Sequence, residues 1–132
     1  MLFRSCRIRL VKGAYLEPSA IVVGGKREVD RAYGRLFVTA LDRGHRIDIA
    51  THDEGLLARV RERLDGNGDA RSRVEFQMLY GVRRDLQGQF AGQGYPVRVY
   101  IPYGTEWYPY LTRRLAERPA NLWFFASNLV RT

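Results

Sequence analysis

Residues 74–79 read VEFQML, a short run in which apolar and polar side chains alternate. The even-numbered positions are apolar, and the intervening Glu75 and Gln77 are polar. Successive side chains of an extended strand point to opposite faces, so this alternation predicts a β-strand with one apolar and one polar face.

Three other segments repeat the alternation and predict three more strands: Arg7–Val11 (RIRLV), Arg46–Ala50 (RIDIA) and Val97–Ile101 (VRVYI). A helical pattern follows each of the four strands. Thr51 or Asp53 can cap the second helix. The helical patterns cover Val29–Leu41, Leu56–Leu64, Asp85–Gln93 and Pro109–Glu117, and a terminal amphipathic segment covers Leu122–Val130. The order βαβαβαβα predicts an α/β fold with a parallel sheet and a single domain over residues 1–132.

The polar face of each strand helps to distinguish two architectures that contain a parallel sheet, the doubly wound sheet and the (βα)₈ barrel. A doubly wound sheet has helices on both faces, so its central strands are apolar throughout. If helices cover only the apolar face here, the polar face lines the lumen of a (βα)₈ barrel, where Arg7, Arg9 and Arg98 lie among Asp48 and Glu75. A sheet with one solvated face is the alternative. Four βα units are half of such a barrel.

The net charge, the cysteine count and the length of the apolar runs limit the classes of protein to which the chain can belong. The chain has 132 residues and a net charge of +8, and 20 of its 22 basic residues are Arg. Because these charges are scattered rather than clustered, we expect no specific nucleic-acid partner; a weak attraction to RNA or to an anionic membrane is the minor alternative. Cys6 is the only cysteine, which excludes an internal disulfide. No apolar run is long enough to span a bilayer and no signal peptide is evident, so we expect a soluble, cytoplasmic protein.

Candidate site residues follow the predicted strands, where barrels of this type carry their chemistry. Lys12, Gly13 and Ala14 follow the first strand, and Thr51 and His52 follow the second. His52 alone is also explained as a turn residue beside a helix start.

The predicted helix from Pro109 places Arg113 and Arg114 beside each other, with Glu117 one turn further on. Two adjacent guanidinium groups are suited to binding a small carboxylate. A solvated helix face with an Arg113–Glu117 pair is the alternative. The chain has neither a G-x-G-x-x-G nor a P-loop motif, which disfavours a Rossmann-type nucleotide site.

Five segments in order resemble the flavin-dependent proline dehydrogenases, and among these the single-activity bacterial enzymes. The segments are RLVKGAY (9–15), ATHD (50–53), EFQMLYG (75–81), VYIPYG (99–104) and YLTRRLAERPAN (110–121). The resemblance covers almost the whole chain and implies the C-terminal half, units 5–8, of a distorted (βα)₈ barrel.

The resemblance implies an FAD enzyme that oxidises L-proline to Δ1-pyrroline-5-carboxylate and passes electrons to a quinone, at the inner surface of the membrane. It also implies a role for particular residues. Arg9 and Tyr100 are the implied catalytic residues; Arg113, Arg114 and Glu117 bind the substrate; Lys12, Gly13, Ala14, Lys26, Thr51, His52 and Gln77 bind the cofactor.

The sequence also departs from the family pattern. Val29 replaces a Thr in the segment KREVDRAY, and Leu16 stands where many relatives have an aromatic residue. No segment matches the early strands, which supply a Lys and an Asp in the family. We therefore expect this chain to be active only with a complementing half-barrel or another copy of itself. A non-enzymatic half-barrel, dimeric or weakly binding polyanions, is the alternative function.

Overall fold

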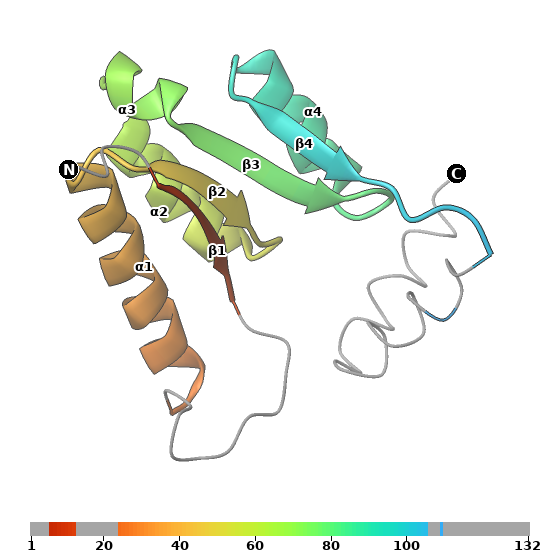
Figure 1. Ribbon diagram of the computed structural model, residues 1–132, viewed down its shortest axis with the longest axis horizontal. Coiled ribbons are helices and arrows are strands. Elements are labelled where there is room, and N and C mark those ends of the chain that lie inside the picture. The colour runs from red at the N-terminus through yellow and green to blue at the C-terminus, as the bar shows by residue number, and fades with distance from the viewer. Residues whose placement is uncertain (1–5, 13–23, 106–108, 110–132) are drawn as a thin grey trace.

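Four parallel strands form one sheet whose order follows the chain, β1-β2-β3-β4, in the computed structural model (Figure 1). The structure describes residues 6–12, 24–105 and 109. The strands are β1 (Arg7–Val11), β2 (Arg46–Ala50), β3 (Val74–Leu79) and β4 (Val97–Tyr100). The first three match their predicted bounds, and β4 ends one residue before the predicted Ile101.

The described helices are α1 (Lys26–Asp42), α2 (Glu54–Leu64), α3 (Gly68–Ser72) and α4 (Arg84–Gly92). Helices α1, α2 and α4 were predicted from their apolar faces, whereas α3 was missed. With five residues, α3 is too short to show a helical period, and Asn67 caps it by accepting a hydrogen bond from the Ala70 amide at 3.0 Å. Of the two predicted C-terminal helical segments, residues 109–117 and 122–130, the structure describes Pro109 alone.

The core lies between the helices and one face of the sheet. Ile47, Ile49 and Phe76 are fully buried and contribute to one cluster with side chains of α1, α2 and α4. Phe76 stacks on Phe90 with ring centroids 4.5 Å apart, and Tyr95 meets Phe76 edge-on at 5.2 Å. The apolar strand positions therefore face the helices, as their alternation predicted.

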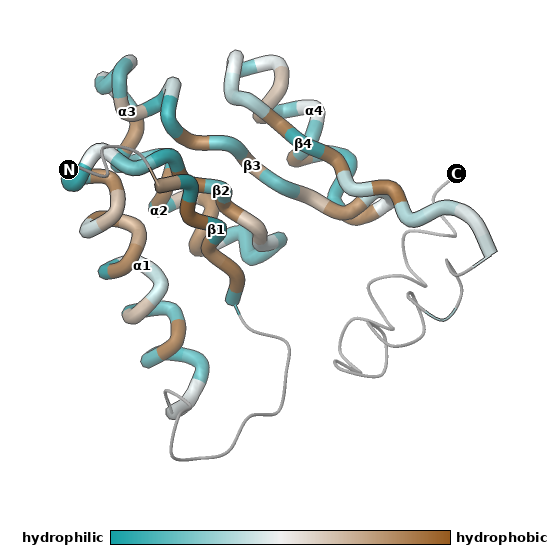
Figure 2. Tube along the Cα trace, in the orientation of Figure 1, coloured by the Kyte–Doolittle hydropathy of each residue, from teal (hydrophilic) through white to brown (hydrophobic). Residues whose placement is uncertain are grey.

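The polar positions of the four strands share the opposite face of the sheet. Parallel pairing sets Arg9 beside Asp48, Asp48 beside Glu75, and Gln77 beside Arg98. Figure 2 shows the alternation of hydrophobic and hydrophilic residues along β3. Within the described ranges, no helix contributes buried side chains to this polar face.

The strand order distinguishes the two parallel architectures. A doubly wound sheet reverses its strand order at a switch point and carries helices on both faces. Here the order is sequential and the helices pack on one face, as in consecutive units of a (βα) barrel. The predicted α/β fold of the partial-barrel type is confirmed.

Candidate functional site

Charged side chains from all four strands form a network on the polar face. The Nε of Arg7 donates to both carboxylate oxygens of Asp48, at 3.0 and 2.9 Å, and its Nη2 lies 3.0 Å from Glu75 Oε1. Arg98 binds the same Glu75 through two bonds, Nε to Oε1 at 2.6 Å and Nη2 to Oε2 at 3.1 Å. The predicted mixture of opposite charges on this face is confirmed.

Glu75 is the centre of this network. The hydrogen bonds from Arg98 are the largest contribution, and although partial burial opposes them, further bonds and charges from Gln77 and Arg7 help lower the pKa of Glu75 to about 2. Glu75 is therefore an ionised carboxylate at neutral pH, able to accept hydrogen bonds but not to donate them.

Arg9 lies on the same face but outside the network. Its side chain is exposed and has no ion-pair partner among the described residues, in contrast to Arg7 and Arg98. Within residues 6–12, 24–105 and 109, no carboxylate forms an ion pair with this guanidinium on the polar face.

Tyr100, the other residue assigned a catalytic role by resemblance, ends β4 and is 54% exposed. Arg9 belongs to β1 and Tyr100 to β4, so β2 and β3 separate them in the sheet. The structure thus places both on the polar face, at opposite edges of the described sheet.

Lys12, directly after β1, lies between two carboxylates from different helices. Its ammonium is 2.7 Å from Asp30 of α1 and forms a second, short contact with Asp53, the N-cap of α2. Only 11% of the Lys12 side chain is exposed. The resemblance implies that Lys12 contacts the cofactor, and no spacing along the chain predicts that Asp30 and Asp53 converge on it.

Electrostatics stabilise this cluster in its charged form. Burial alone would lower the pKa of Lys12, but the hydrogen bonds and charges of Asp30 and Asp53 outweigh it, so the pKa is raised. Burial alone would raise the pKa of Asp53, and Lys12 together with the Leu56 amide lowers it instead. Lys12 and Asp53 therefore stay ionised at neutral pH.

Thr51 and His52 form the turn after β2. Thr51 is buried, and its hydroxyl accepts a hydrogen bond from the Asp53 amide at 3.1 Å. The Leu79 amide donates to His52 Nε2 at 3.0 Å, which ties the carboxyl end of β2 to that of β3. Burial, with a smaller effect from Arg83, lowers the pKa of His52, so the ring is neutral and carries its proton on Nδ1.

The remaining predicted residues lie at separate points. Lys26 is the exposed first residue of α1, and Gln77 lies on the polar face, where its Nε2 donates to Glu75 Oε1 at 3.0 Å. Outside the described residues lie Gly13, Ala14, Arg113, Arg114 and Glu117.

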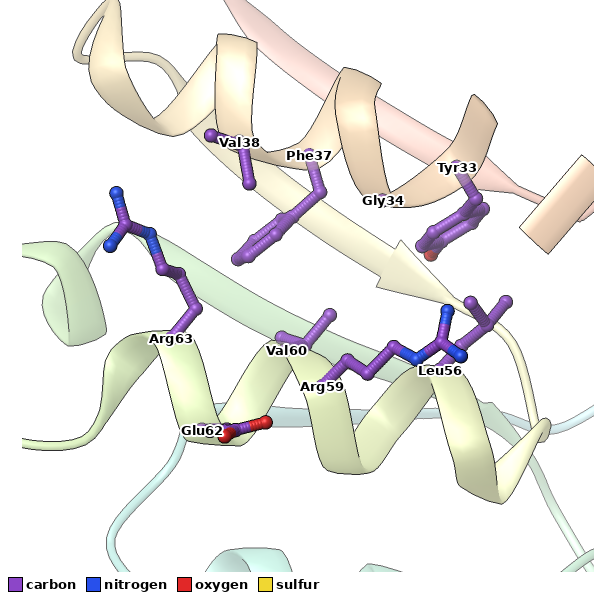
Figure 3. Close-up of a pocket in the computed structure, with 9 residues that line it drawn as sticks. All are labelled: Tyr33, Gly34, Phe37, Val38, Leu56, Arg59, Val60, Glu62 and Arg63. Atoms are coloured by element: carbon purple, nitrogen blue, oxygen red, sulfur yellow. The ribbon is translucent and has the colours of Figure 1, made fainter. Parts of the chain in front are cut away.

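A groove of about 460 Å³ opens between α1 and α2, away from the polar face. Figure 3 shows Tyr33 and Phe37 of α1 directed toward Leu56 and Val60 of α2, with Arg59 and Arg63 beside them. None of the predicted site residues lines it, and its apolar lining consists of the side chains that pack the two helices together. The candidate site is therefore the polar face and the adjoining strand ends.

Two features are absent from the described part of the chain. It contains no group of three or more His, Cys, Asp or Glu side chains placed to hold a metal ion. None of its helices combines the length and the apolar character needed to cross a membrane.

A family model described as proline dehydrogenase matches residues 3–127, nearly the whole chain. The chain belongs to the proline dehydrogenase family. It is 47% identical over 124 residues to a proline dehydrogenase of Deinococcus radiodurans, covering 94% of this chain and 40% of that protein.

Two Bacillus subtilis proteins give similar matches. Proline dehydrogenase 1 is 41% identical over 124 residues, covering 94% of this chain and 41% of the relative. Proline dehydrogenase 2 is 44% identical over 117 residues, covering 89% of this chain and 39% of the relative. This chain thus spans about two fifths of the length of these relatives.

Proposed function

We propose that this chain provides the FAD- and proline-binding part of a barrel that oxidises L-proline to Δ1-pyrroline-5-carboxylate. The electrons pass to a quinone, which puts the reaction at the inner membrane surface. Membership of the proline dehydrogenase family supports the reaction. Because the chain spans about two fifths of its relatives, we assign activity to its complex with a complementing half-barrel.

The observation that carries the proposal is the exposed guanidinium of Arg9 on the polar face, which has no ion-pair partner in the part of the chain that the structure describes. When bound, FAD would supply an anionic diphosphate and a ring system able to take up the two electrons of the oxidation and the negative charge that comes with them. A fixed guanidinium stabilises negative charge that develops during a reaction, especially where water is excluded. The residues fit such a cofactor, because the Arg9 guanidinium and the Gln77 side-chain amide lie on the same open side of the sheet.

The remaining roles follow the resemblance. Arg9 is placed beside the reacting part of the cofactor, and Gln77, Thr51, His52 and Lys26 help to hold it. Arg113 and Arg114 bind the proline carboxylate, Glu117 orients the two guanidinium groups, and Tyr100 covers the substrate ring.

The surroundings of Lys12 refine its proposed role. Its ammonium already contacts Asp30 and Asp53, so little of its charge is available to a ligand. We therefore assign the cofactor contacts of Lys12, Gly13 and Ala14 to their main chain, with the Lys12 side chain fixing where that main chain leaves β1.

The test is to purify the chain, add FAD, and record the visible spectrum and proline-dependent dye reduction. Both are measured for the chain alone and with the N-terminal portion of the Deinococcus radiodurans relative. We expect flavin uptake and activity in the mixture, and a roughly hundredfold loss of activity for Arg9→Gln. Arg59→Gln, an exposed Arg of α2, is the control and keeps full activity. Absence of flavin uptake in every mixture refutes the proposal.

A second candidate is a non-enzymatic half-barrel that pairs with another copy of itself. The observation that favours it is that, in the described sheet, β1 and β4 are each paired along one side only. Sedimentation over a range of concentrations tests it: a stable dimer with no flavin uptake supports this candidate, and a monomer at all concentrations contradicts it.

A further inference from the structure

Gln77 and Glu75 are neighbours on the polar face of β3, two positions apart on the same strand. The amide nitrogen of Gln77 donates to Glu75 Oε1 at 3.0 Å. Gln77 is partly exposed on a face that the described helices leave uncovered. The amide nitrogen of Gln77 is thus bonded to Glu75, and the carbonyl oxygen lies at the other end of the amide group.

The hydrogen-bonding properties of Glu75 determine which way the Gln77 amide is turned. The Glu75 carboxylate only accepts hydrogen bonds, so an amide turned the other way would set two oxygens against each other. Both amide hydrogens are on the nitrogen, so the carbonyl end can only accept.

The carboxylate that fixes Gln77 is itself held in place. Arg98 of β4 binds it through two bonds, and Arg7 of β1 contacts it from the other side. Only 20% of the Glu75 side chain is exposed. Glu75 is therefore held from strands on both sides of β3, which makes it a rigid anchor for its neighbour.

We propose that Glu75 is a positioning residue that turns the Gln77 carbonyl toward the ligand, so that this point of the site selects an N–H or O–H donor. The proposal rests on the proposed function only in taking FAD as that ligand. Glu75 does not touch the ligand in this account; it acts through Gln77.

The first experiment needs no ligand and uses the whole chain. In ¹H–¹⁵N NMR spectra, we expect the Gln77 side-chain amide to exchange with water several-fold more slowly than that of the exposed Gln89. Glu75→Gln removes this protection, whereas Glu62→Gln, the same substitution at an exposed site on α2, preserves it. Equal exchange of Gln77 and Gln89 in the wild-type chain overturns the proposal even if the Glu75 variant fails to fold.

The second experiment measures FAD affinity by flavin fluorescence, in the mixture with the N-terminal portion described above. Glu75→Gln and Gln77→Met are each expected to weaken binding about tenfold. Because Glu75 acts through Gln77, the double variant should be no weaker than Gln77→Met alone, whereas an independent structural effect would add to it.

The outcomes separate the two proposals. If the wild-type mixture takes up no FAD while the Gln77 amide is protected, the proposed function fails and the orientation of Gln77 stands. If FAD binds equally well to the wild type and to Glu75→Gln, or if the two losses add, the positioning role of Glu75 is wrong.

Discussion

Lys12 is the residue at which the end of β1 is joined to two helices. Its ammonium contacts Asp30 on α1 and Asp53 at the start of α2, and its side chain is mostly buried, with 11% exposed. A partly buried carboxylate is costly without a counter-charge. Removing the ammonium leaves two such carboxylates close together.

We predict that Lys12→Met lowers the free energy of unfolding by about 2 kcal/mol at pH 7, measured by urea denaturation. Lys26→Met is the matched control, because Lys26 is the other lysine of the chain and is exposed; its effect should be below about 0.5 kcal/mol. Equal effects of the two substitutions would contradict this account of the cluster.

The difference in stability between the wild type and Lys12→Met should change with pH in a definite direction. Because Lys12 lowers the pKa of Asp53 below its ordinary 3.8, the stabilisation is present above that pH and is lost as the pH falls below it. The raised pKa of Lys12 means that the stabilisation is lost again only above its ordinary 10.5. The gap between wild type and Lys12→Met should thus be constant near neutrality and shrink in acid.

Among the secondary-structure elements, α2 depends on Asp53 for its first turn. Asp53 Oδ1 accepts a hydrogen bond from the Leu56 amide at 3.1 Å, which satisfies one of the free amides at the helix start. The same side chain also contacts Lys12, so a simple deletion mixes two effects.

A pair of substitutions separates the cap from the ion pair. Asp53→Asn retains a capping oxygen and loses the charge, and Asp53→Ala loses both. We predict that the Ala variant is less stable than the Asn variant by about 1 kcal/mol in urea denaturation. Equal stability of the two variants would mean that the cap hydrogen bond contributes nothing.

The strands were predictable because each one shows period-2 alternation over at least four residues, and apolar residues from all four strands contribute to or pack against the same core cluster. Helix α3 was not predictable, because five residues are too few to reveal a helical face. The network around Glu75 was foreseen as a mixture of charges, but its partners depend on the register between strands. The convergence of Asp30 and Asp53 on Lys12 depends on how two helices pack, which periodicity along the chain does not report.

On the scale of the whole molecule, the described sheet has two edges and one polar face that no described helix covers. Unpaired edge strands invite pairing with another chain. Barrel closure pairs both edges and encloses the polar face, which removes this liability. The proposed complementing half-barrel would therefore pair with the edge strands β1 and β4.

We therefore predict a specific pattern of hydrogen exchange, measured by mass spectrometry on peptides from each strand. In the chain alone, β2 and β3 should exchange slowly because both neighbours are in place, and β1 and β4 faster. Adding the N-terminal portion of the Deinococcus radiodurans relative should slow exchange in β1 and β4 and leave β2 and β3 unchanged. If β1 and β4 are already as protected as β2 and β3 in a dilute, monomeric chain, their edges are covered from within the chain and the complementation model is wrong. If protection in β1 and β4 instead rises with the concentration of the chain alone, a second copy fills the place of the complementing half.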